Sequence, residues 1–198
     1  MTLNKMDVLT DAQMKKWIAL YMQSASAYNV MHRSWTGRLV HKLRRESYAG
    51  YEESASRRWE RAIANKMANL KQCKSFDELW REVGKIQVAG IGELSKYDTA
   101  TCIGCECNLY PQYVYLHAGT AEGAAAIGIK GKKVLKEVFV ARFAAFEVLE
   151  PTQIEDFLCI YKSCLRGDTE DCERVCRKHR LLTQTFDRRH QKHSRQSC

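Results

Sequence analysis

The sequence predicts an all-α fold, with several helices packed into a globular domain. Apolar residues recur at steps of three and four through most of the chain, which is typical of amphipathic helices, and strand signals are sparse. Hydrophobic residues make up 45% of the chain, enough to build a core. Only two prolines and eleven glycines interrupt the 198 residues. We therefore expect a single helical domain over residues 1–182, followed by a basic, flexible tail over residues 183–198.

In the first half of the chain, apolar stripes and capping signals define the helices. Asp11 can cap the first helix, and Ser75 with Glu78 three residues later has the spacing of a capping box. Such a box satisfies free N–H groups at a helix start, so a short helix should follow Ser75. The predicted helices here cover residues 11–31, 37–46, 51–72 and 76–83.

In the second half, glycines separate the apolar stretches. Pro151 suits the first position of a helix, where its missing N–H costs nothing. Gly167 ends that helix, and Thr169 begins the last one. Between residues 105 and 119 we expect a loop with a brief extended segment. The predicted helices cover residues 120–127, 132–143, 151–167 and 169–182, after one that begins at residue 93.

The charge distribution favours a polyanionic partner. The formal net charge is +9, and residues 32–45 carry basic side chains without an acidic one. No apolar run is long enough to span a bilayer, and the first residues carry charges where a secretory leader would be apolar. We therefore expect a cytoplasmic protein, or a nuclear one in a eukaryote, that binds nucleic acid and no membrane.

Two basic stretches are candidate phosphate contacts. In the first, the basic side chains recur at near-helical steps, and the second lies in the predicted tail. A solvated helix face is the alternative interpretation of such a charge run. The candidate contacts are Arg33, Arg38, Lys42, Arg45, Arg188 and Arg189.

A glycine-rich turn between two predicted helices carries the most specific signal. Gly90 and Gly92 flank Ile91, and Val88 precedes them. Glycines permit positive φ and expose backbone N–H groups, while Ile91 can turn inward. The helix that begins at residue 93 presents free N–H groups at the same place, which suits a phosphate oxygen. Gly90, Ile91 and Gly92 are therefore candidate DNA-backbone ligands; the alternative is a tight turn between packed helices.

Over residues 75–128 the chain resembles the helix-hairpin-helix DNA glycosylase superfamily of endonuclease III-like enzymes. Val88, Gly90, Ile91 and Gly92 match the apolar-Pro-Gly-apolar-Gly hairpin of that family, with Ala89 in place of proline. The helix-hairpin-helix element would cover residues 76–104. The resemblance implies a helical fold that grips double-stranded DNA through its backbone, with weak sequence selectivity.

The positions that carry catalysis in that family are changed here. Its aspartate falls at Tyr115 or Leu116, and its lysine at Leu94. The resemblance thus implies DNA binding without glycosylase chemistry.

Two alternatives stay open. One is a divergent base-excision glycosylase or lyase, for which the candidate catalytic residues are Lys96, Asp98 and His117. The other is a non-enzymatic protein-interaction module with basic faces, in which the hairpin is only a packed turn.

The nine cysteines leave two interpretations: reduced, packed thiols or a metal site. Four of them, Cys159, Cys164, Cys172 and Cys176, lie near the position where endonuclease III-like enzymes hold an iron–sulfur cluster, but their spacing is different. We expect no cofactor. A zinc ion or an iron–sulfur cluster on these four cysteines is the alternative.

Overall fold

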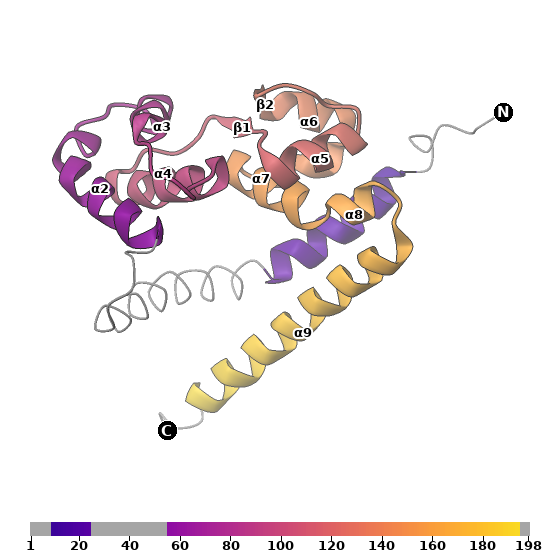
Figure 1. Cartoon of the computed structure of the whole chain (residues 1–198). Coiled ribbons are helices and arrows are strands. Elements are labelled where there is room, and N and C mark those ends of the chain that lie inside the picture. Colours follow the sequence, from indigo (N-terminus) through magenta and orange to yellow (C-terminus); the bar gives the residue numbers. More distant parts are fainter. Residues whose placement is uncertain (1–8, 25–54, 195–198) are drawn as a thin grey trace. The chain divides into compact units, whose positions relative to one another are not determined.

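The computed structural model describes the backbone of residues 9–24 and 55–194, and side chains within these ranges as far as residue 181, Ser56 excepted. This part of the chain is mostly helical, as the sequence predicts, with one small two-stranded sheet (Figure 1). The chain divides into two compact units. Unit 1 combines residues 1–36 with 114–198, and unit 2 is residues 37–113.

Unit 2 contains three described helices: α2 (Ala55–Leu70), α3 (Phe76–Lys85) and α4 (Glu93–Cys107). Aromatic rings join α3 to α4, because Phe76 and Trp80 both contact the ring of Tyr97 edge-on, with centroids 6.0 and 5.7 Å away. The larger core cluster of unit 1 contains none of these three aromatic residues.

The predicted cap of α3 is confirmed. The Ser75 side chain accepts a hydrogen bond from the Glu78 backbone N–H at 3.2 Å. The Glu78 carboxylate in turn accepts from the backbone N–H of Lys74 at 2.7 Å. The helix continues to Lys85, beyond the predicted end, because Gly84 is accommodated within it.

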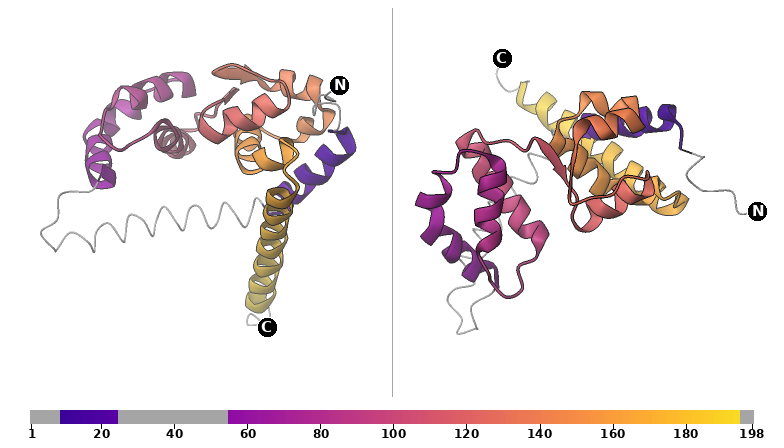
Figure 2. Two further views of the ribbon diagram at one scale, coloured as in Figure 1. Left: turned by 45° about the vertical axis from the view of Figure 1, so that its right-hand side comes forward. Right: turned by 90° about the horizontal axis from the view of Figure 1, so that it is seen from above.

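Among the described residues of unit 1, the first helix covers residues 11–24 and the last is the long helix α9 (Thr169–Ser194). Figure 2 shows both helices in two further views. Between them in sequence lie the strands, the middle helices and a 3-10 helix. These elements are β1 (Tyr113–Tyr115), α5 (Ala118–Ala126), β2 (Lys133–Leu135), α6 (Lys136–Arg142), η3 (Ala144–Val148), α7 (Pro151–Ile160) and α8 (Lys162–Leu165).

The predicted helix over residues 132–143 is correct only in its second part. Strand β2 replaces its first residues and pairs with β1, where Leu116 donates its backbone N–H to the Lys132 carbonyl at 2.8 Å. Gly131 precedes this strand with φ of +148° and turns the chain before it. The brief extended segment expected between residues 105 and 119 is β1.

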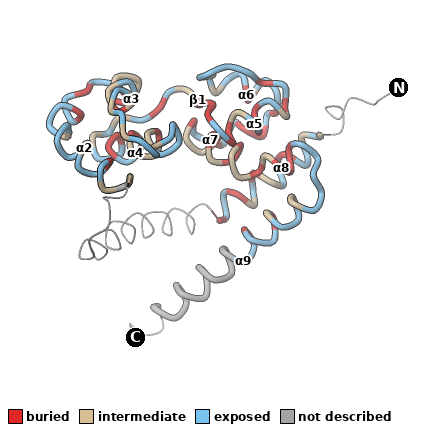
Figure 3. Tube along the Cα trace, in the orientation of Figure 1, coloured by how far each residue is buried: buried red, intermediate tan, exposed pale blue. Residues whose placement is uncertain are grey.

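The core of unit 1 is aromatic and lies around α7. The Phe157 ring stacks on Tyr161 with centroids 4.7 Å apart and meets Phe146 edge-on. Met14 and Ile18 of the helix over residues 11–24 belong to the same core. In Figure 3, buried stretches coincide with α5, α7 and α8. The N-terminal helix is therefore held by residues far along the chain.

Helices α7 to α9 follow the predicted boundaries with one addition. Pro151 opens α7 and Thr169 opens α9, as predicted. The predicted helix is interrupted at Tyr161, so that α8 is a separate short helix. It ends before Gly167, whose φ is +77°. The α9 backbone continues to Ser194, past the predicted end at 182, because no glycine or proline follows Gly167. Among the described helices, none combines the length and apolarity needed to cross a bilayer.

Candidate functional site

The glycine-rich turn lies between α3 and α4, where the sequence placed it. Gly90 has φ of +87°, a conformation that favours glycine, and the Ile91 N–H closes the turn on the Val88 carbonyl at 3.1 Å. Gly90 and Gly92 are exposed, and Ile91 is half-buried. The turn therefore presents bare backbone to solvent while one apolar side chain anchors it.

The start of α4 is open to solvent beside this turn. Gly92 is the N-cap residue, with φ of −87° and ψ of 176°, and no side chain caps the helix. A Cβ added at Gly92 would have no atom within 4 Å. Glu93 is the acidic residue of the first turn. The uncapped N–H groups carry the positive end of the helix dipole, to which an anion is attracted.

Of the candidate catalytic residues, Lys96 and Asp98 are both on α4. The Lys96 ammonium donates a hydrogen bond to the Gly84 carbonyl at 3.1 Å, in a partly buried contact that ties α4 to α3. Asp98 is half-buried on the same helix. His117 belongs to unit 1, whereas the other two belong to unit 2. Lys96 thus has a structural contact that a free amine nucleophile would lack.

A buried polar cluster lies between α5 and α7 in unit 1 and consists of His117, Thr120 and Glu155. The Thr120 hydroxyl donates to Glu155 Oε1 at 2.5 Å, and His117 Nε2 lies 3.5 Å from the same oxygen. Glu155 and His117 are each 5% exposed, and Thr120 is fully buried. A buried carboxylate is costly unless polar groups compensate it, so these contacts hold Glu155 in place.

Small residues allow this cluster to form. A Cβ at Gly123 would fall on the Leu158 carbonyl oxygen, so this glycine lets α5 approach α7 closely. Ala118, beside His117, has φ of +41°, a strained conformation for a residue with a side chain. Sequence reasoning missed Glu155, although a signal was available: it occupies an apolar position of α7, one residue after buried Ile154.

Charged side chains cover the exposed edge of the same region. Arg166 and Lys162 both contact the Glu122 carboxylate, at 2.8 and 3.5 Å. A Cβ at Gly119 would lie 2.9 Å from the Cys159 sulfur and 3.1 Å from the Lys162 ammonium nitrogen. Cations therefore lie next to the start of α5.

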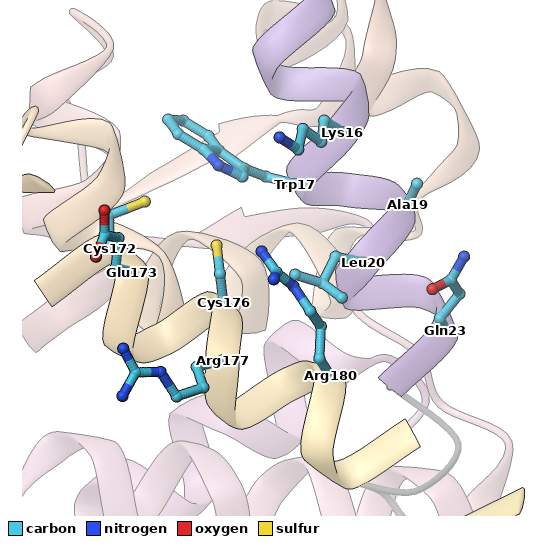
Figure 4. Close-up of a pocket in the computed structure, with 10 residues that line it drawn as sticks. All are labelled: Lys16, Trp17, Ala19, Leu20, Gln23, Cys172, Glu173, Cys176, Arg177 and Arg180. Carbon is cyan, nitrogen blue, oxygen red and sulfur yellow. The ribbon is translucent and has the colours of Figure 1, made fainter. Parts of the chain in front are cut away.

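A cavity of about 760 Å³ lies between the helix over residues 11–24 and α9 (Figure 4). Figure 4 shows Trp17, Cys176 and Arg180 pointing into the space between the two helices. The lining carries three basic side chains and one acidic one, so an anion would be attracted there. The lining residues are Lys16, Trp17, Ala19, Leu20, Gln23, Cys172, Glu173, Cys176, Arg177 and Arg180.

The structure brings together three of the four cysteines named as metal candidates. The sulfurs of Cys164, Cys172 and Cys176 all lie within 4.8 Å of one another, and the first two are at disulfide distance. Cys159 is not in this group, because its sulfur lies against Gly119 on α5. A set of four ligands drawn from these cysteines is therefore not formed.

The side chains of the remaining candidate phosphate contacts are not among those that the structure describes. Four of them, Arg33, Arg38, Lys42 and Arg45, lie outside the described residues. Arg188 and Arg189 lie on the α9 backbone, in the part whose side chains are not described.

One comparison with known proteins gives a match. A family model described as "ADDT: Amino acid:DNA transferase" matches residues 10–170. No curated protein matches the chain, and no solved structure matches it. The matched range begins just before the N-terminal helix of unit 1, includes all of unit 2 and ends in the first turn of α9.

Proposed function

Because the chain belongs to the amino acid:DNA transferase family, we propose that it binds double-stranded DNA and transfers an amino acid to it. The family match carries this proposal. It covers most of the chain and includes both the glycine-rich turn and the buried polar cluster. The net charge of +9 agrees with a nucleic-acid partner.

We assign the contact with DNA to the turn between α3 and α4, used as a helix-hairpin-helix. Gly90 and Gly92 are exposed, Ile91 anchors the turn, and no side chain caps α4. A phosphate oxygen accepts hydrogen bonds from such N–H groups, and this contact reads no base. DNA binding should therefore be weakly sequence-selective and sensitive to salt.

Glycosylase or lyase chemistry is disfavoured by the position of Lys96. An amine nucleophile must be free to attack, whereas the Lys96 ammonium donates to the Gly84 carbonyl. The neighbouring Asp98 lies on the same helix. A transfer reaction needs no lysine nucleophile from the protein, because the amino acid supplies its own amine.

The transfer itself requires a proton acceptor. In its simplest form, the amine nitrogen attacks a nucleotide carbon that carries a leaving group. The N–C bond forms, and the leaving group departs with the electron pair of the bond that breaks. The nitrogen then loses one proton. We assign the acceptance of this proton to the pair His117 and Glu155. Oε1 of Glu155 accepts the hydrogen bond from Thr120 and lies 3.5 Å from Nε2 of His117.

DNA binding is tested by fluorescence anisotropy of a labelled duplex, from about 50 to about 200 mM salt. Gly92→Val should bind several-fold more weakly, because the new side chain has space in the protein but covers the phosphate site. Gly84→Ala is the matched control, since a Cβ there also meets nothing within 4 Å. Equal binding by all three proteins would contradict the assignment of the hairpin.

Transfer is tested on DNA from a source strain whose gene for this chain has been deleted, because that DNA retains the unreacted acceptor nucleotide. The DNA is incubated with the protein and isotope-labelled amino acids, digested to nucleosides and analysed by mass spectrometry. We expect a labelled nucleoside with the wild type and none with Glu155→Gln. Glu122→Gln, which changes an exposed carboxylate on α5, should remain active. Absence of any labelled nucleoside would contradict the transfer.

A further inference from the structure

Three cysteine sulfurs meet where α8, the following loop and α9 come together. Cys164 is on α8, and Cys172 and Cys176 are one turn apart on α9. Cys164 and Cys176 are buried, and Cys172 is half-buried. All three sulfurs lie within 4.8 Å of one another.

We propose that these three thiolates bind a zinc ion in the reduced protein, and that the fourth coordination position faces the cavity beside Trp17. In a tetrahedral zinc site the Zn–S bonds are about 2.3 Å long, which separates the sulfurs by about 3.8 Å. The three sulfurs lie within 4.8 Å of one another, but the Cys164 and Cys172 sulfurs are closer than this separation, so zinc binding requires that this pair is reduced and that its two sulfurs move apart. Three protein ligands and one open position are typical of zinc sites that bind an exogenous ligand.

The charges around the cluster suit a metal held by thiolates. Three thiolates and one Zn²⁺ carry a net charge of −1, and Lys16, Arg177 and Arg180 line the adjoining cavity. Cys176 is buried, and Lys16 and Arg180 line the cavity beside it. A metal ion would supply the positive charge that a buried thiolate needs.

The position of the cavity explains why the fourth ligand would come from outside the cluster. Cys172 and Cys176 line the cavity, whereas Cys164 is buried behind them. Among described residues, the group contains no fourth cysteine, histidine or carboxylate. A water molecule or a small ligand entering beside Trp17 would complete the tetrahedron.

Metal binding depends on the oxidation state of the cluster. Cys164 and Cys172 lie at disulfide distance, and closing that bond would remove two of the three ligands. Zinc should therefore bind only after reduction. Because the readout is metal content, the test is independent of DNA binding and of amino acid transfer.

The experiment uses the full chain, reduced with a phosphine, stripped of metal and titrated with zinc against a chromogenic chelator. We expect one zinc ion per chain. Loss of a direct ligand should cost more than the tenfold to about hundredfold typical of outer-shell changes, so Cys176→Ser should weaken binding at least about a hundredfold. Cys159→Ser is the matched control, because Cys159 is a half-buried cysteine outside the cluster. Its affinity should equal that of the wild type.

A second measurement on the wild type does not depend on the folding of any variant. Cobalt(II) should give the intense visible bands of a tetrahedral thiolate site, and zinc should protect three thiols from a thiol reagent. No bound zinc in the reduced wild type would overturn the proposal. It would equally be overturned if Cys176→Ser, folded by circular dichroism, bound zinc as tightly as Cys159→Ser.

Discussion

The hydroxyl oxygen of Ser24 lies 2.5 Å from Nδ1 of His179, and this contact joins the N-terminal helix to α9. The same hydroxyl donates its proton to the Tyr21 carbonyl at 2.9 Å. A serine hydroxyl has one proton, so it must accept the hydrogen bond from the imidazole. The contact therefore requires the His179 tautomer that carries a proton on Nδ1.

This arrangement predicts that the protein loses stability in mild acid. Burial, and to a lesser extent the charge of Lys178, lowers the pKa of His179 below its usual value near 6.5. Around and below about pH 6.5 the unfolded chain therefore binds more protons at this residue than the folded chain. The free energy of unfolding consequently decreases as the pH is lowered. One such proton contributes at most about 1.4 kcal/mol per pH unit. Urea unfolding at about pH 7.5 and about pH 5.5 measures this loss.

His179→Asn is the control for this prediction, because asparagine keeps a donor near the position of Nδ1 and does not titrate. Its stability should change less between the two pH values than that of the wild type. An identical pH dependence in both proteins would show that His179 is not responsible.

Replacing Gly123 by alanine should destabilise unit 1 by about 1–3 kcal/mol, because the added Cβ would fall on the Leu158 carbonyl oxygen and push α5 from α7. Gly84→Ala should instead be neutral or stabilising by up to about 1 kcal/mol, since it has free space within α3. Urea titration of both variants, followed by circular dichroism, measures the difference. Equal effects would contradict the close contact of α5 with α7.

Thr120→Val should cost about 1–3 kcal/mol, because the buried Glu155 oxygen loses its hydroxyl donor while valine keeps the shape of threonine. Thr120→Ser retains the hydroxyl and should lose much less. The free energy of unfolding of both variants tests this. If serine and valine proved equally destabilising, the hydrogen bond would contribute nothing, and packing alone would explain the loss.

At the hairpin, Gly90→Ala should cost about 1–2 kcal/mol, because Gly90 has φ of +87°. Its Cβ would also lie 3.0 Å from Cβ of Ala55. Gly92→Ala should stay within about 0.5 kcal/mol of the wild type, since it has φ of −87° and open space. Thermal unfolding of the two variants separates the positions, and equal melting temperatures would contradict the described turn.

The helical elements could be predicted because their signals are local. Ser75 with Glu78, Pro151 and Thr169 each mark a helix start that depends on nearby residues alone, and each start is confirmed. Strand β2 could not be predicted in this way. Its three residues are extended because they pair with β1, and only the tertiary structure brings the two segments together.

The same distinction applies to the candidate sites. The turn at Gly90 and Gly92 is local, so its spacing could be found in the sequence. The contact of Thr120 with Glu155 spans 35 positions, and that of Ser24 with His179 spans 155. No spacing rule connects residues so far apart. Three of the four candidate cysteines lie together, and the helical spacing of Cys172 and Cys176 on one face made that pair predictable. The sulfur of Cys159 instead packs against Gly119, a contact that spacing does not indicate.

The division of unit 1 into two sequence segments has a consequence for synthesis on the ribosome. Tyr21 hydrogen-bonds Asp156, which is 135 positions later, so the apolar face of the first helix emerges long before its partners are translated. Residues 37–113, which form a unit that is continuous in sequence, are translated in the meantime. Until α7 is complete, the nascent chain exposes Met14 and Ile18, and a chaperone that binds apolar helices would find its target there.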